Sequence, residues 1–193
     1  MTLPAAHRTI DAIWKMESPK LIAGLTRMVR DVGLAEDLAQ DALVIALERW
    51  PETGIPDNPG AWLMTASKRR AIDLLRRSKL REQKYAEIAG SAPLFTEDDM
   101  DRILDGEIGD DLLRLIFMTC HPVLSQEARV ALTLRLLCRL TTDEIARSFL
   151  VAESTIAQRI VRAKKMLNKE KIAFEVPAGE ELAERLAAVL EAI

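Results

Sequence analysis

Aromatic residues, glycine, cysteine and histidine are all scarce in this sequence of 193 residues. Aromatic residues make up 4% of the chain, which also holds eight glycines, two cysteines and two histidines. Runs of β-branched residues are scarce too, whereas Leu, Ala, Arg, Glu and Asp dominate. Most of these abundant residues form helices readily, whereas a β-sheet protein would need more aromatic and β-branched residues. We therefore predict an all-α protein.

Further absences narrow the class of protein. No segment has the length or polarity of a signal peptide or a membrane span, so we expect a cytoplasmic protein. Cys120 and Cys138 fall on separate predicted helices without metal-ligand spacing, so we expect buried thiols in a reducing compartment. Neither His7 nor His121 is placed with a carboxylate or nucleophile, and no glycine-rich phosphate loop is present. The sequence therefore predicts no enzyme, no metal site and no cofactor.

The charge of the chain is unevenly distributed. The net charge is only −3, yet eight basic residues lie within 68–84 and eight acidic residues within 97–111. A basic block beside an acidic block polarises the chain locally although it is nearly neutral overall. A dense basic face is costly in self-repulsion, so we predict that the 68–84 block binds phosphates.

Residues 140–167 have the pattern of a helix-turn-helix. Thr141 and Glu144 fit a capping box, in which a hydroxyl and a carboxylate satisfy the donors at a helix start. A break is expected near Leu150 and Val151. A second helix is then expected over 152–168.

This second helix has two distinct faces. Ile156, Ile160, Ala163 and Leu167 share one face, which we expect to be buried. Gln and Arg side chains can read base edges, and Lys can neutralise phosphates. The alternative is a solvated helical hairpin. The opposite face and its flank carry Ser154, Thr155, Gln158, Arg159, Val161, Arg162 and Lys165.

Helical periodicity and breakers predict two helical units. The first should contain helices over 6–16, 18–30, 34–49 and 59–78, with a loop over 51–59. An acid-rich linker over 85–108 should follow. The second unit should begin near residue 109, with helices over 111–119 and 125–138 before the helix-turn-helix. A last amphipathic segment, 180–192, either docks on the second unit or continues into further chain.

Two helices of the first unit carry polar faces. On the 34–49 helix, Glu36, Asp37, Gln40 and Asp41 lie away from the apolar side, which suits either plain solvation or docking to a basic helix of a partner. On the 59–78 helix, Trp62 falls among basic residues. An indole amid cations is typical of single-strand nucleic-acid sites. Packing of Trp62 under the preceding helix or loop is the alternative.

Several sequence motifs, in the order in which they occur along the chain, resemble those of a known family. AEDLAQDA at 35–42 precedes AWLMTASKRRAIDLLRR at 61–77, and LRLIFMTCHPVLSQEARVALTLRLLCRLTTDEIA leads into the helix that contains RAKKML. The sequence resembles bacterial RNA polymerase sigma factors of the extracytoplasmic function (ECF) group in the sigma-70 family, over about residues 10–175. Within that group it is similar to a subgroup that carries a C-terminal extension.

The resemblance implies a domain plan and partners. Residues 1–84 would form sigma region 2, 85–108 an acidic linker, 109–175 sigma region 4, and 176–193 the start of the extension. The protein would direct core RNA polymerase to promoter DNA. The β′ clamp helices would bind Glu36, Asp37, Gln40 and Asp41. The −10 element would bind Asn58, Trp62, Lys68, Arg69, Arg70, Arg76 and Arg77. The −35 element would bind Ser154, Thr155, Gln158, Arg159, Arg162 and Lys165.

The sequence departs from the family pattern at several points. Arg69 stands where the family usually has Asn, and Ala152 stands where it often has Ser. Relatives of the subgroup continue beyond residue 193, so we expect a longer native chain. Two candidate regulators stay open, an anti-sigma factor and the extension. An autonomous helix-turn-helix regulator is the alternative function, although the chain offers one reading helix and no clear dimer helix.

Overall fold

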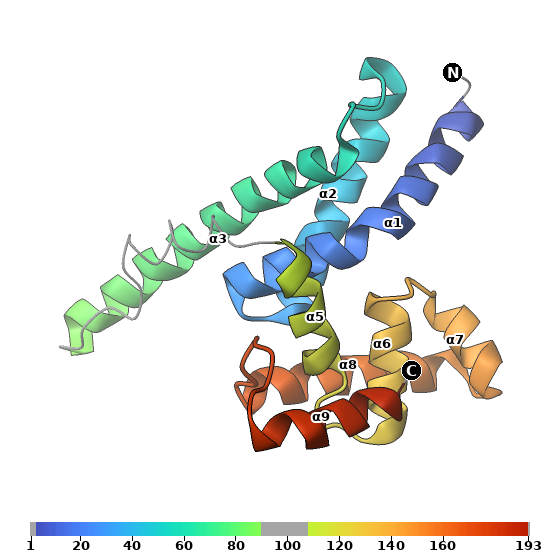
Figure 1. Ribbon diagram of the computed structural model, residues 1–193. Coiled ribbons are helices and arrows are strands. Elements are labelled where there is room, and N and C mark those ends of the chain that lie inside the picture. The colour runs from blue at the N-terminus through green and yellow to red at the C-terminus, as the bar shows by residue number, and fades with distance from the viewer. Residues whose placement is uncertain (1–2, 90–107, 193) are drawn as a thin grey trace.

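The computed structural model describes residues 3–89 and 108–192, and every regular element in these ranges is a helix (Figure 1). The all-α prediction is therefore confirmed. Among these residues, the structure contains no helix with the length and apolar character of a membrane span. The helices are α1 (Leu3–Val29), α2 (Val32–Thr53), α3 (Pro59–Ala89), α5 (Ile108–Thr119), α6 (Gln126–Leu136), α7 (Thr142–Phe149), α8 (Glu153–Lys169) and α9 (Glu180–Leu190).

Helix α1 is continuous, so the predicted break at Ser18 is wrong. Pro19 lies inside the helix, where it lacks an N–H donor and disfavours helical geometry in the preceding residue. The apolar residues on both sides of it pack into one core: Trp14 is 6% exposed, and Ile22 and Leu25 are fully buried. Packing against α2 and α3 therefore outweighs the local cost of the proline.

Two other helices also run past their predicted ends. Helix α2 passes through Pro51 and ends at Thr53. Gly54 caps it, with a φ of 86° that suits a residue without Cβ and an N–H that bonds to the carbonyl of Trp50. Helix α3 runs to Ala89 rather than residue 78, because the residues after Ser78 are mostly good helix formers. The predicted linker thus begins within α3. Its acidic tract, 97–107, lies outside the described residues.

The second unit, residues 108–192, contains the predicted helix-turn-helix. Thr141 and Glu144 form the expected capping box, and Leu150 turns the chain in a left-handed conformation (φ 54°) before α8. Ile145 and Ile156 pack in the core between these helices. Cys120 is buried as predicted, but Cys138 is exposed because α6 ends at Leu136 and leaves it in the following connection.

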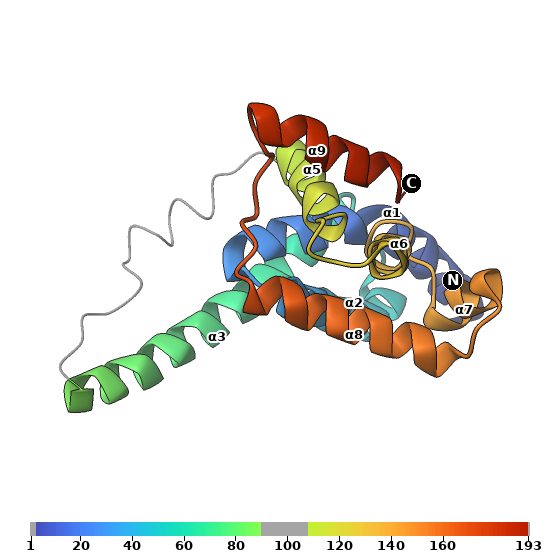
Figure 2. The same ribbon diagram turned by 90° about the horizontal axis from the view of Figure 1, so that it is seen from below.

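Helix α9 docks on the rest of the second unit, which is one of the two possibilities that its sequence suggested. Val189 and Ala192 pack against Phe117 and Cys120, and the buried Arg185 donates to the carbonyl of Phe117 over 3.0 Å. Figure 2 shows α9 lying across α5. The opposite side of the helix stays exposed, with Leu182, Leu186 and Leu190 at 39%, 45% and 72% exposure.

The two units pack against each other in this structure. Helix α5 contacts α1, and α8 contacts α2 (Figure 2). Arg27 of α1 pairs with the buried Asp111 of α5 at 2.9 Å. Asn168 of α8 donates to the carboxylate of Asp31, which also caps the start of α2. Their contact joins the apolar residues of the first unit (residues 3–89) and of α5–α8 into one cluster.

Truncation of Ile156, which is fully buried on α8, should destabilise the protein. We expect Ile156→Ala to lower the free energy of unfolding by about 2–5 kcal/mol, because it leaves a cavity. Val161→Ala on the same helix, where the side chain is 50% exposed, should change it by less than about 0.5 kcal/mol. Urea denaturation followed by circular dichroism measures both. Equal losses would contradict the burial pattern of α8.

Candidate nucleic-acid interface

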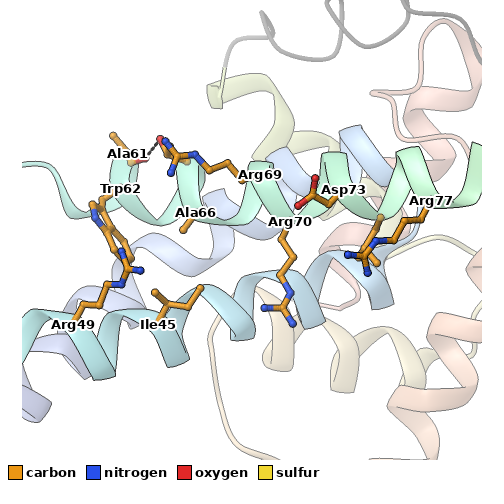
Figure 3. Close-up of a pocket in the computed structure, with 11 residues that line it drawn as sticks. Ile45, Arg49, Ala61, Trp62, Ala66, Arg69, Arg70, Asp73 and Arg77 are labelled. Carbon is orange, nitrogen blue, oxygen red and sulfur yellow. Dashed lines mark hydrogen bonds between the residues drawn. The ribbon is translucent and has the colours of Figure 1, made fainter.

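A groove of about 760 Å³ runs between α2 and α3 (Figure 3). Its apolar floor includes Ile45 and Ala66, while cationic side chains extend from both helices. The position follows from helix packing, because α3 packs against α2 and residues of both helices line the groove. The lining residues are Ile45, Arg49, Ala61, Trp62, Thr65, Ala66, Arg69, Arg70, Asp73, Leu74 and Arg77.

Trp62 has an apolar partner and also lines the groove. Its ring lies 5.3 Å from that of the buried Trp50, at an interplanar angle of 66°, which is an edge-to-face contact. This is the packing under the preceding helix that the sequence left as an alternative. The indole is nevertheless only half-buried, so it can offer part of its surface to a ligand in the groove.

The groove is strongly cationic. Arg49, Arg69, Arg70 and Arg77 all line it, against one acidic residue, Asp73. Arg69, Arg70 and Arg77 belong to the basic block that the sequence identified. Arg49 does not, and Figure 3 shows it extending from α2 toward the ring of Trp62. Sequence reasoning missed Arg49 because α2 was treated as an acidic helix.

The other residues predicted for the −10 element lie outside the lining of this groove. The side-chain oxygen of Asn58 accepts a hydrogen bond from the N–H of Ala61 at 3.0 Å, which caps the start of α3. Lys68 is half-buried, and Arg76 is exposed. Trp62, Arg69, Arg70 and Arg77 are therefore the predicted residues that the fold brings together.

Some polar residues on the acidic side of α2 are exposed to solvent, and others contact the protein. Asp37 and Gln40 are exposed. Asp41 is 42% exposed and pairs with Arg70 at 2.9 Å, so it adjoins the groove. Glu36 is only 2% exposed, so its expected place on an open face is wrong: the second unit covers it.

The outer face of α8 is open to solvent. Ser154, Gln158, Arg162 and Lys165 are exposed, as the sequence predicted for a reading face. Thr155 and Arg159 are half-buried on the flank, and Arg159 lies near Glu127 of α6, where its charge helps lower the pKa of that carboxyl. The main causes of that lowered pKa are hydrogen bonds from the Glu127 backbone and from Ser125.

The start of α8 is fixed without a hydroxyl cap. Ala152 occupies the N-cap position, and its side chain forms no hydrogen bond there. Instead, Thr142 of α7 donates to the carboxylate of Glu153 at 2.6 Å, which connects the starts of α7 and α8. This contact links α8 to the helix before it.

Comparison with known proteins identifies the two units. The Sigma-70 region 2 model matches residues 13–81, and the Sigma-70, region 4 model matches residues 114–167. The first match contains α2 and the residues of the groove. The second contains the helix-turn-helix.

Full-length relatives agree with these matches. An uncharacterized protein of Rhizobium meliloti is 38% identical over 93% of this chain and 43% of its own length. The "Probable ECF RNA polymerase sigma factor SigI" of Mycobacterium tuberculosis is 30% identical over 90% of this chain and 59% of its own. The "ECF RNA polymerase sigma factor SigK" of Mycobacterium sp. is 27% identical over 80% of both chains.

The chain spans about half the length of the first two of these relatives. Region 2 and region 4 nevertheless occur in it in the expected order, each with its own match. The similarity to proteins named as ECF sigma factors extends across both regions. The chain belongs to the sigma-70 family, in its ECF group.

Proposed function

We propose that this protein directs core RNA polymerase to promoters, with α8 reading the −35 element and the α2–α3 groove holding the single-stranded −10 element. One observation carries the proposal: a single chain combines an exposed helix-turn-helix reading face with a separate groove that is both cationic and aromatic. The first suits duplex DNA and the second suits a separated strand. A promoter that is being opened presents both.

The −35 assignment is supported by the shape and chemistry of α8. The helix is 17 residues long, and its exposed face places Gln158 and Arg162 one turn apart. Both side chains can form paired hydrogen bonds to base edges in the major groove. Lys165, one turn beyond Val161 on the same face, can neutralise a phosphate. Ser154 and Thr155 lie at the start of the helix, where short hydroxyl side chains reach the backbone of DNA.

The −10 assignment is supported by the composition of the groove. Bases stack on aromatic side chains irrespective of sequence, and arginines hold the phosphates between them. Trp62 supplies the ring, while Arg49, Arg69 and Arg77 supply the charges. Asn58, Lys68 and Arg76 would then contact the strand beyond the groove. Two modules on one chain gain further affinity, because the binding of one raises the effective concentration of the other.

Polymerase docking is assigned to the acidic side of α2. Asp37, Gln40 and Asp41 present acidic and amide groups suited to basic side chains of the β′ clamp helices. Glu36 completes the set once it is uncovered. We propose that the protein acts by binding rather than by catalysis, in the bacterial cytoplasm, where polymerase and chromosome are found.

Complex formation with core polymerase, followed by run-off transcription, tests this function. We expect the protein to bind core polymerase and to start transcription at a defined promoter. Asp37→Arg should weaken binding at least tenfold, because it reverses an exposed charge in the proposed docking surface. Glu52→Arg, an equal reversal at the exposed end of the same helix, should not. Recognition of duplex DNA without any association with polymerase would instead favour an autonomous helix-turn-helix regulator.

Arg49→Gln should weaken binding of a single-stranded −10 oligonucleotide. Loss of one phosphate contact should also reduce the slope of log affinity against log salt by about 0.7. Arg8→Gln, an exposed arginine on α1, serves as the control and should leave the slope unchanged. Fluorescence anisotropy across a salt series measures both variants. Identical slopes for the two would exclude Arg49 from the strand-binding site.

Arg162→Ala should relax the specificity of −35 recognition. If Arg162 reads a base, its loss should cost about 1–3 kcal/mol on the preferred sequence and much less on a sequence substituted at that base pair. Affinities for a set of singly substituted −35 duplexes, measured with polymerase present, test this. A uniform loss on every duplex would assign Arg162 to a phosphate instead.

A further inference from the structure

Val161 is an apolar side chain on the polar outer face of α8. It is 50% exposed, although valine is a residue that proteins usually bury. Gln158 lies three residues before it and Lys165 four residues after it, so both adjoin Val161 on the helix surface. Arg162 follows it directly. The valine is therefore surrounded on this face by polar side chains that we assign to the −35 element.

Packing within the protein does not account for this valine. The buried stripe of α8 consists of Ile156, Ile160, Ala163 and Leu167, and it does not include Val161. The side chain also belongs to neither of the two apolar clusters among the residues that the structure describes. A single exposed valine is common on protein surfaces, and exposure alone therefore assigns it no role.

Helix stability does not account for the valine either. The branched side chain of valine restricts χ1 in a helix, so valine forms helices less readily than Ala, Leu, Arg or Gln. The same restriction holds its two methyl groups in one orientation, since valine in a helix mostly adopts a single χ1 rotamer. Val161 thus presents a fixed apolar surface, and a contact there would cost little side-chain entropy.

The major groove of DNA offers one apolar group to such a side chain. Each base pair presents hydrogen-bond donors and acceptors at its edge, and only thymine adds a methyl group at C5. Gln158 and Arg162 carry hydrogen-bonding groups that suit the edges of adenine and guanine, respectively. Val161 carries none. Its favourable contact in the groove is therefore with a thymine methyl group.

We propose that Val161 is a specificity-determining residue of the −35 site, which selects a thymine by contact with its 5-methyl group. The inference rests on the proposed function and deepens it, because it names a base that the reading helix requires. Gln158 and Arg162 would read base edges by hydrogen bonding, whereas Val161 would read an apolar surface. The preferred −35 element should then contain at least one thymine whose methyl group contributes to affinity.

Replacement of thymine by uracil removes this methyl group and leaves base pairing unchanged. The test uses the complex of the protein with core polymerase and a labelled duplex of the −35 sequence that this complex prefers. Each thymine is replaced by uracil in turn, and fluorescence anisotropy measures the affinity. We expect one of these replacements to weaken binding by the unsubstituted protein about fourfold, as for the loss of one buried methyl group.

Val161→Ala should remove the preference for thymine over uracil. It should weaken binding of the thymine duplex about three- to tenfold, because the apolar partner of the methyl group is lost. Its affinities for the thymine and uracil duplexes should be equal. The fold should be unaffected, since the side chain is half-exposed. Val161→Ile, which keeps a branched apolar side chain, should retain the preference.

Met166→Ala is the matched control, since Met166 is an exposed apolar residue of the same helix that lies outside the proposed reading set. This variant should prefer thymine over uracil to the same extent as the unsubstituted protein. Loss of the preference in Met166→Ala as well as in Val161→Ala would contradict a specific contact of Val161.

Other results would also overturn the inference. If the preferred element lacks thymine, or if uracil is accepted at every position without loss, no methyl group is read. If Val161→Ala retains the thymine preference, another side chain makes the contact. If it weakens binding of both duplexes alike, Val161 contacts the sugar–phosphate backbone instead. A complex without any preference among −35 duplexes would refute the −35 assignment of α8 itself, and with it the inference.

Discussion

The contact between the two units of this protein surrounds one buried carboxylate. Glu36 lies at 2% exposure among three cations of the second unit, and such a charge is stable there only while those cations stay in place. The contacts of Asp31 with Asn168 and of Arg27 with Asp111 follow the same pattern of charge pairing across the two units. The arrangement of the two units therefore depends on electrostatic pairing as well as on apolar packing.

Because of this contact, some of the candidate binding surfaces are exposed to solvent and one is partly covered. The outer face of α8 and the α2–α3 groove are accessible in this structure, whereas Glu36, one member of the proposed docking surface, is not. The groups that we propose to bind DNA therefore need no change of shape to become accessible.

Much of the fold follows from the sequence because the signals are local. The capping box at Thr141 and Glu144, the buried stripe of α8 and the core side of α2 with Trp50 are set by residues within a few turns of each other. Errors arose where tertiary packing decided the outcome. Pro19 predicts a break when only neighbours in sequence are considered, yet Trp14 and Ile22 hold both halves of α1 in one core.

The residues of the candidate sites also differ in whether they could be predicted from the sequence. The exposure of Gln158 and Arg162 could be predicted from helical periodicity, because their face is set by α8 itself. Trp62, Arg69, Arg70 and Arg77 could be grouped because they share one helix. Arg49 could not be added, since it reaches the groove from α2, and the burial of Glu36 depends on residues 99 to 128 positions away in the chain. Contacts between different helices produce no periodic pattern in a single sequence.

The pairing of Arg70 with Asp41 connects the groove to the acidic side of α2. One guanidinium cannot fully neutralise both a carboxylate and an incoming phosphate. A strand that attracts Arg70 would leave Asp41 with its full negative charge, directed at whatever basic surface lies beside α2. Nucleic acid in the groove would then strengthen the binding of a basic partner to the acidic side of α2. Conversely, a bound partner that neutralises Asp41 would leave Arg70 able to pair with the strand. The two surfaces would thus be mutually reinforcing through a single shared side chain.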